Sequence, residues 1–431
     1  MPMESVPGEV LRYALVSYDR DGVERPEDGR PFSDAVTGML AAGPYTDVIL
    51  VSHGWNGDLP AAREQYTRWF ATMLAATADR AALAARPGGF RPLVVGLHWP
   101  SRAWGDEELG GAAFAAGPPG AATSADDLID RYALLLGDND RVRTALRTIV
   151  TAALADIAPD TMPPEVAAAY AVLDAESRLG AEGAGASPGS DREPFDAEAA
   201  FEEAMAEEEF VAFGGGGFGG LLAPLRTLTF WSMKRRACHF GETGATTLLR
   251  RLREAVPAGH DVRFHLIGHS FGCIVMSAAV AGSPPADTLV LIQGALSLWS
   301  YAAEIPGLPG RAGYFRQIME DRLVRGTIVT TMSQHDRAVG FFYPLGAAAA
   351  RQTAYPTGGF PTYGAVGAFG LRGLTTTDMP MREASERYDF RPGGVYNLES
   401  SRFIATGRGP SGAHSDICHP EVAHAVWQAI G

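Results

Sequence analysis

One stretch of the chain constrains the fold more than any other, because an apolar run, a turn and a second apolar run follow one another without a break. Residues 262–267 (VRFHLI) form a short, mostly apolar run with the length of a buried strand. The turn at 268–272 reads Gly-His-Ser-Phe-Gly. Residues 271–282 (FGCIVMSAAVAG) are small and apolar, and the pair Pro284-Pro285 follows, which predicts a buried helix with a stop signal. The sequence therefore predicts a strand, a sharp turn and a helix in direct succession.

The turn fits the pattern G-x-S-x-G, in which glycines on both sides allow a serine to stand at a sharp bend. The pattern alone decides little. With 51 glycines in 431 residues, chance is expected to produce it in about one of every three chains of this length. Residues 185–189 (GASPG) also fit it around Ser187, but no apolar strand or helix flanks them. Pro188 also lacks the N–H that is needed directly after a nucleophile. We therefore interpret Ser270 as the candidate nucleophile and Ser187 as a coincidence.

Predicted strands and helices alternate along the outer parts of the chain. The apolar segments typical of strands lie within 10–22, 47–58, 91–101, 262–268, 288–296, 326–336 and 394–401. The segments typical of helices are 59–83, 241–256, 271–282, 313–324 and 420–430. Strands that alternate with helices imply a parallel sheet that is covered on both faces. The expected fold class is therefore α/β, with a mostly parallel, doubly wound sheet.

The middle of the chain interrupts this alternation. Residues 1–101 and 241–431 are expected to form one domain, with residues 102–240 as a long insertion. Within the insertion, residues 125–180 carry apolar side chains at helical spacing, whereas 180–220 are rich in Gly, Ala, Ser, Pro and acidic residues. We expect this last stretch to be flexible, as either a lid or a solvated linker, and its excision to leave the fold intact.

Charge and cysteine content exclude several classes of partner. The net charge is −14, and residues 181–210 alone carry ten acidic side chains against one arginine. No basic surface for nucleic acid is indicated. No apolar stretch approaches the length of a membrane span, and the N-terminal residues lack the pattern of a signal peptide. The three cysteines favour a reducing compartment, hence the cytoplasm, although a single Cys238–Cys418 bridge stays open.

A serine nucleophile needs a histidine to take its proton and an acid to orient that histidine. In a parallel sheet, these groups are expected at the carboxyl ends of strands. Asp336 ends the predicted strand and loop at 326–336. His414 lies after the last predicted strand in a loop of Gly, Pro and Ser, the kind of segment that carries catalytic groups on a rigid sheet. The chain order is therefore Ser270, Asp336, His414.

Each of these assignments has rivals in the sequence. His419 directly precedes Pro420 at the start of the last predicted helix, where the helix dipole disfavours an imidazolium. Asp416 and Glu304 are the other candidate acids. A metal site formed by His414, Asp416, His419 and His424 is another reading, but their spacing lacks the i,i+4 pairing and the H-E-x-x-H motif. No metal is therefore predicted.

These features resemble the α/β-hydrolase superfamily. The resemblance is carried by the turn at 268–272, by the order Ser, Asp, His, and by the Ser-His-Gly-Trp-Asn-Gly loop at 52–57. It covers about residues 8–101 and 241–431. The segment Leu-His-Trp-Pro-Ser at 97–101 is similar to a poorly characterised bacterial group within the superfamily.

The resemblance implies an α/β-hydrolase fold and roles for single residues. The implied residues are the nucleophile Ser270, the acid Asp336, the base His414, the oxyanion-hole N–H donors Trp55 and Phe271, and the elbow glycines Gly268 and Gly272. The long insertion departs from the superfamily pattern, because caps more often follow the strand that here is 288–296. Two further histidines are expected to be structural: His53 to shape its glycine loop and His269 to pack against the sheet. For His98 two readings stay open, lining the pocket or ending a strand.

The expected activity is hydrolysis of carboxylic esters through an acyl-enzyme, with a small-molecule acyl substrate and no organic cofactor. Thioesters and amides are alternative substrates for the same three residues. A non-catalytic binding protein that retains the fold is the alternative from another class. Such a protein has no need of Ser270, Asp336 and His414 together, so the enzyme is the preferred hypothesis.

Overall fold

The computed structural model describes residues 3–8, 11–55, 59–101, 125–156, 159–210, 220–338, 359–407 and 412–431. The chain divides into two compact units. The first unit comprises residues 1–100, 184–188 and 236–431, and the second comprises residues 101–183 and 189–235.

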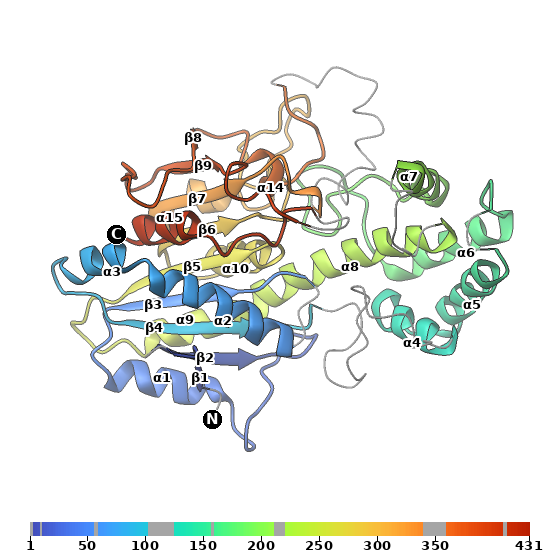
Figure 1. Cartoon of the computed structure of the whole chain (residues 1–431). Coiled ribbons are helices and arrows are strands. Elements are labelled where there is room, and N and C mark those ends of the chain that lie inside the picture. The colour runs from blue at the N-terminus through green and yellow to red at the C-terminus, as the bar shows by residue number, and fades with distance from the viewer. Residues whose placement is uncertain are drawn as a thin grey trace. The chain divides into compact units, whose positions relative to one another are not determined.

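The first unit is built on one sheet, whose strands in the described residues have the order β1-β2-β4-β3-β5-β6-β7-β9-β8 (Figure 1). The strands are β1 (Met3–Ser5), β2 (Arg12–Ser17), β3 (Asp47–Ser52), β4 (Pro92–His98), β5 (Arg263–His269), β6 (Ala286–Ile292), β7 (Val324–Met332), β8 (Thr377–Pro380) and β9 (Val395–Glu399). Neighbouring strands are parallel, except for the antiparallel pair of β1 and β2. The predicted mostly parallel α/β sheet is confirmed.

Helices lie on both faces of this sheet (Figure 1). The helices of one face are α2 (Leu59–Ala75), α3 (Thr77–Ala84) and α15 (Pro420–Ile430), and α15 contacts the other two. The helices of the other face are α1 (Phe32–Ala42), α9 (Thr246–Glu254) and α10 (Gly272–Ala281). The short helices α11 (Gln317–Glu320) and α14 (Val366–Phe369) and the π-helical turn η2 (Gly241–Ala245) complete the unit. The helix predicted over 59–83 is divided at Ala76 into α2 and α3. Of the helix predicted over 313–324, only the four residues of α11 are helical.

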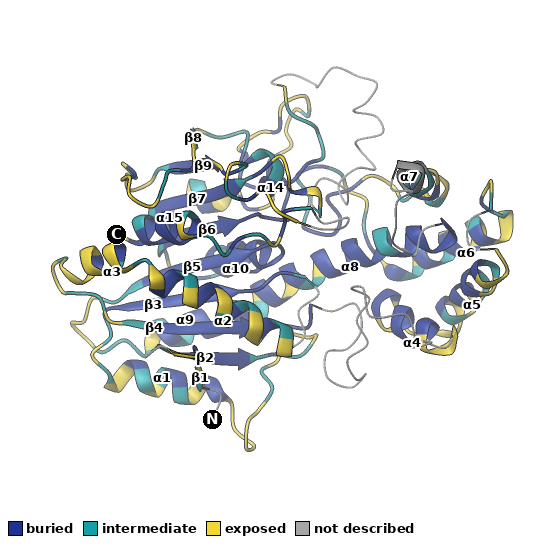
Figure 2. Ribbon diagram, in the orientation of Figure 1, coloured by how far each residue is buried: buried dark blue, intermediate teal, exposed yellow. Residues whose placement is uncertain are grey.

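The sheet forms the buried centre of the first unit (Figure 2). All six residues of β3 and every residue of β5 after Arg263 are buried. Against one face, α15 packs a stripe that includes Val422, Val426 and Ile430. This spacing puts apolar side chains on one side of a helix, which explains why α15 was recognisable in the sequence. None of the described helices combines the length and apolar character that crossing a bilayer requires.

The second unit is helical in its described residues. Its helices are α4 (Ala125–Leu136), α5 (Asp140–Ala155), α6 (Pro164–Ser177), α7 (Ala197–Phe210), the 3-10 turn η1 (Gly220–Leu222) and the first part of α8 (Ala223–Phe240). The first three of these occupy the range 125–180 that the periodicity predicts to be helical. The run of four glycines at 214–217 lies outside the described residues.

The range predicted to be a flexible linker, 180–220, differs from that expectation in its described part. Asp191 is buried and forms an ion pair with Lys234, whose side chain is 0% exposed. Arg192 is also buried and donates through Nε to the carbonyl of Gly180 at 3.0 Å. Composition failed here because two charged residues of the stretch, Asp191 and Arg192, fold inward and are paired there. Excision of 180–220 would leave Lys234 buried without its carboxylate, so it is expected to destabilise the second unit.

The glycines around Ser187 have a packing explanation. Gly185 has a φ of +86°, and a Cβ there would lie 2.3 Å from the carbonyl oxygen of Ala312. Gly189 has a φ of +105°, and its Cβ would lie 2.6 Å from the Cβ of Arg235. Both positions therefore require glycine for reasons unrelated to an elbow.

The Cys238–Cys418 bridge that the sequence left open does not form, since all three cysteines are free thiols.

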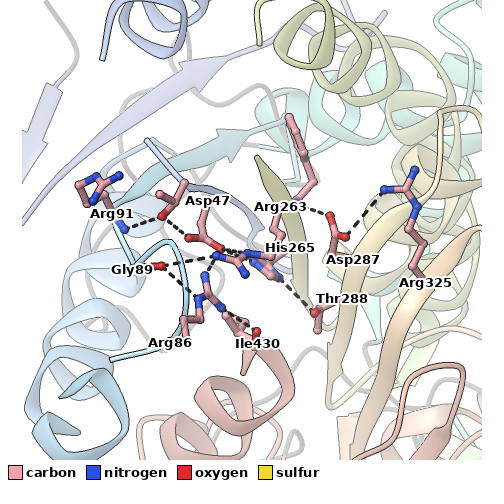
Figure 3. Close-up of polar contacts among 12 residues, drawn as sticks. Asp47, Arg86, Gly89, Arg91, Arg263, His265, Asp287, Thr288, Arg325 and Ile430 are labelled. Atoms are coloured by element: carbon pink, nitrogen blue, oxygen red, sulfur yellow. Dashed lines mark hydrogen bonds and ion pairs between the residues drawn. The ribbon is translucent and has the colours of Figure 1, made fainter. Parts of the chain in front are cut away.

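The amino ends of the parallel strands carry a buried polar cluster (Figure 3). Asp47, at the start of β3, is fully buried. Its Oδ1 accepts hydrogen bonds from His265 Nε2 at 3.0 Å and Arg263 Nε at 3.2 Å, and it forms an ion pair with Arg86. Arg86 also donates to the carbonyl of Ile430 at 3.2 Å. The cluster thus links β3 and β5 to the end of α15.

Replacement of Asp47 by asparagine is expected to lower the free energy of unfolding by about 3–5 kcal/mol, because it leaves Arg86 without its buried anion. Burial alone raises the pKa of Asp47, but hydrogen bonds from His265, Thr46 and Arg86 outweigh it and hold this pKa well below its usual value. The contribution is therefore complete above the pKa of an unfolded aspartate, about 3.9, and is lost as the pH falls below it.

Urea unfolding of the wild type and the Asp47→Asn variant, at neutral pH and near pH 3, measures both effects. Asp34→Asn is the matched control, since Asp34 also pairs with an arginine, Arg251, but its side chain is 56% exposed. The control should change the free energy of unfolding by less than about 1 kcal/mol. Equal losses in the two variants would mean that Asp47 contributes no more than a surface carboxylate.

Candidate active site

Ser270 stands at the turn between β5 and α10, as the sequence predicts. Its φ is +57°, in the left-handed region that residues other than glycine seldom adopt. A Cβ on Gly268 would lie 2.4 Å from the carbonyl oxygen of Gly272, and a Cβ on Gly272 would lie 2.3 Å from that of Ser52. Both elbow positions are thus restricted to glycine by close approach of the backbone, and the strained turn raises the serine at the carboxyl edge of the sheet.

The structure brings Ser270, His414 and Asp336 together in one hydrogen-bonded series. The Oγ of Ser270 lies 2.7 Å from His414 Nε2, and His414 Nδ1 lies 2.8 Å from Asp336 Oδ2. All three residues are buried. Asp336 follows β7 and His414 follows β9, so parallel strands deliver all three groups to the same edge. The two loops are joined by a backbone hydrogen bond from Ala413 N to His335 O of 2.9 Å.

The partners fix the direction of these hydrogen bonds. An ionised carboxylate can only accept, so His414 Nδ1 carries a proton and donates it to Asp336. In the neutral imidazole, Nε2 is then an acceptor, and the hydroxyl of Ser270 donates to it. This arrangement is the one in which a serine can lose its proton to the histidine.

The loop after β3 lies against the nucleophile. A Cβ on Gly54 would be 2.6 Å from the Cβ of Ser270, so only glycine allows this approach. The N–H of His53 donates to the hydroxyl of Tyr66 at 2.9 Å, and that hydroxyl donates to the carbonyl of Leu97 at 2.6 Å. Tyr66 thereby holds the loop to the end of β4. Trp55 follows Gly54 directly, which places its backbone next to this approach.

His53 and His98 have the structural surroundings that the sequence suggests. The ring of His53 is parallel to that of Trp99, with 5.8 Å between centroids, and its Nδ1 lies 2.8 Å from the carbonyl oxygen of Gly54. His98 ends β4 and is fully buried. Burial, reinforced by the neighbouring His53, lowers the pKa of His98 to about 2. His98 is therefore neutral at ordinary pH.

His269 does more than pack against the sheet, which is the role expected from the sequence. Its Nε2 lies 3.1 Å from the main-chain carbonyl oxygen of His414, and its Nδ1 lies 3.0 Å from the side-chain nitrogen of Gln65 on α2. The rings of His269 and His414 are 5.1 Å apart. Thus the residue before the nucleophile contacts the segment that carries the histidine.

Gln293, which the sequence analysis does not identify, contacts the acid. Its Nε2 donates to Asp336 Oδ2 at 2.8 Å, the same oxygen that faces His414. Gln293 is fully buried with a φ of +45°, and Thr331 Oγ1 donates to its Oε1 at 2.8 Å. In the sequence, Gln293 lies inside the predicted strand 288–296, and nothing in the pattern indicated that the strand ends one residue earlier, at Ile292.

The rival residues are bonded elsewhere. His419 Nε2 lies 2.8 Å from Asp416 Oδ1, and Asp416 Oδ2 accepts the backbone N–H of Thr406 at 2.8 Å. Glu304 is exposed and accepts the N–H of Gly310 at 3.2 Å. His424 Nδ1 lies 2.8 Å from an oxygen of Asp79.

The three histidines of the alternative metal-site reading thus contact three different acids, Asp336, Asp416 and Asp79. Within the described ranges, no three His, Cys, Asp or Glu side chains are grouped as a metal site requires.

None of the family models, curated proteins or solved structures compared with this chain matches it. A function for the site is therefore inferred from its own geometry and chemistry.

Proposed function

We propose that this chain is a serine hydrolase of the α/β-hydrolase type that cleaves carboxylic esters through an acyl-enzyme. The observation that carries the proposal is the series from Ser270 Oγ through His414 to Asp336, with separations of 2.7 and 2.8 Å. The strained, glycine-flanked position of Ser270 supports it, because strain of this kind clusters at functional sites. A serine with no catalytic role needs neither a strained backbone nor a histidine that is itself bonded to a buried carboxylate.

In the proposed reaction, Ser270 Oγ attacks the acyl carbonyl carbon and its proton passes to His414 Nε2. The carbonyl electron pair moves onto oxygen and forms a tetrahedral intermediate. When the carbonyl re-forms, the bond to the alcohol oxygen breaks, and the alcohol leaves with the proton from His414. Water then repeats these steps on the acyl-serine and releases the acid. Asp336 stabilises the imidazolium in both halves of the reaction.

The backbone N–H groups of Trp55 and Phe271 are the proposed donors to the carbonyl oxygen as it becomes negative. Support comes from two features of the site. The approach of Gly54 to Ser270 brings the backbone that precedes Trp55 next to the nucleophile. Phe271 is the N-cap residue of α10, and the N-terminal end of a helix favours negative charge. A donor of this kind contributes about 3–4 kcal/mol to catalysis.

The test is covalent labelling by a fluorophosphonate probe, followed by mass spectrometry of the labelled peptide. We expect one adduct, on Ser270, and turnover of p-nitrophenyl acetate and butyrate. The same acyl groups presented as a thioester and as an anilide identify the preferred bond. Faster cleavage of the thioester or anilide, relative to their uncatalysed rates, would replace esterase by thioesterase or amidase. If the protein showed no labelling and no turnover, the result would favour the non-catalytic binding protein.

A further inference from the structure

His269 links the nucleophile strand to the segment that carries the base, and this gives it a part in the reaction. It is the last residue of β5, directly before Ser270. We infer that His269 is a positioning residue: its Nε2–H holds the main-chain carbonyl of His414 and so fixes the imidazole between Ser270 and Asp336. The inference rests on the proposed function, because it assigns His414 as the base.

The protonation state of His269 follows from its two partners. The carbonyl of His414 can only accept, so His269 Nε2 carries the proton of that 3.1 Å hydrogen bond. In a neutral ring, Nδ1 is then an acceptor, and Gln65 Nε2 donates to it at 3.0 Å. Burial first, and His414 second, lower the pKa of His269 to about 3. The other titratable group that acts on this pKa is His53, also an imidazole.

Because His269 lies at the end of a paired strand, its hydrogen bond to the carbonyl of His414 is fixed in position. β5 is paired to β3 as far as Gly268 and to β6 as far as His269, so main-chain pairing restricts the motion of its end. One paired strand end thus carries both the nucleophile and the group that sets the position of the base. A displacement of about 1 Å in such a pair costs on the order of a hundredfold in rate.

Two amide substitutions separate the roles of the two ring nitrogens. The side-chain nitrogen of glutamine can reach the position of Nε2 and donate to His414, whereas that of asparagine reaches only the position of Nδ1. We expect His269→Gln to keep kcat within about threefold of wild type, and His269→Asn to lower kcat about ten- to a hundredfold. KM should stay within about threefold in both, since neither change touches the acyl group.

Gln65→Glu tests the same role through pH. A carboxylate beside Nδ1 favours the doubly protonated ring of His269, which raises the pKa of that ring. The resulting cation opposes the imidazolium that His414 must become. When the pH is lowered from about 9 to about 6, we therefore expect the kcat of the Gln65→Glu variant to fall about tenfold further than the kcat of the wild type. The double variant Gln65→Glu/His269→Gln, which has no titrating ring at position 269, should follow the wild-type profile.

A readout without turnover separates failure of this inference from failure of the proposed function. The proton on His414 Nδ1, held by Asp336, should give a low-field proton resonance in protein with 15N-labelled histidine. We expect His269→Gln to retain this resonance and His269→Asn to shift or broaden it, with the fold unchanged by circular dichroism. An inactive wild type with this NMR pattern would overturn the hydrolase but not the positioning. Equal kcat, pH profiles and resonances in all variants would overturn the positioning of His414 by His269.

Discussion

Alanine in place of Ser270 is expected to abolish fluorophosphonate labelling and to lower kcat for p-nitrophenyl esters on the order of a millionfold. The loss is this large because the acyl-enzyme cannot form without Oγ, and the base at 2.7 Å then has no proton to take. The measurement is probe labelling beside initial rates of hydrolysis. The midpoint of thermal unfolding should not fall, since alanine removes one oxygen from a strained turn and adds no bulk.

Ser187→Ala is the matched control, because Ser187 stands in the second G-x-S-x-G pentapeptide of the same chain. It should keep wild-type labelling and turnover, because Gly185 is explained by its approach to Ala312 and Gly189 by its approach to Arg235. Loss of labelling in the Ser187 variant, with labelling retained in the Ser270 variant, would move the nucleophile to Ser187.

The second large effect is expected at His414. We expect His414→Ala to lower kcat at least about a thousandfold, because the proton of Ser270 then has no acceptor. His419→Ala should stay within about tenfold of wild type, since His419 is bonded to Asp416 and occupies the N-cap position of α15. Initial rates with p-nitrophenyl butyrate, with circular dichroism as the check on folding, measure both. The opposite ranking of the two variants would identify His419 as the base.

The sheet and the meeting of the three polar groups could be predicted for one physical reason. Buried parallel strands have continuous apolar runs, and their carboxyl ends meet at one edge, so Ser270, Asp336 and His414 had to converge there if each followed such a strand. The edge strands β1 and β8 were not predicted. Each is short and none of its residues is buried, so neither leaves an apolar pattern in the sequence.

Two other features could not be predicted because they depend on pairing across long separations. The order of 180–192 follows from charges that neutralise one another in space, such as Asp191 with Lys234, and composition counts charges without pairing them. The contact of Gln293 with Asp336 depends on a left-handed backbone at Gln293, which its residue type does not announce. In both cases the missing information is tertiary.

The strand order has a consequence for synthesis of the chain on the ribosome. The inner strand β3 pairs with β4, which ends at residue 98, and with β5, which begins at residue 263. At about 5–20 residues per second, the second partner of β3 emerges roughly 10–30 s after the first. Throughout that interval the nascent sheet exposes an apolar edge with unsatisfied backbone groups, the kind of surface that other chains pair with. Chaperones that bind the nascent chain are therefore expected to matter for the yield of folded protein in the cell. They are expected to matter less for refolding of the complete chain, in which both partners of β3 are present from the start.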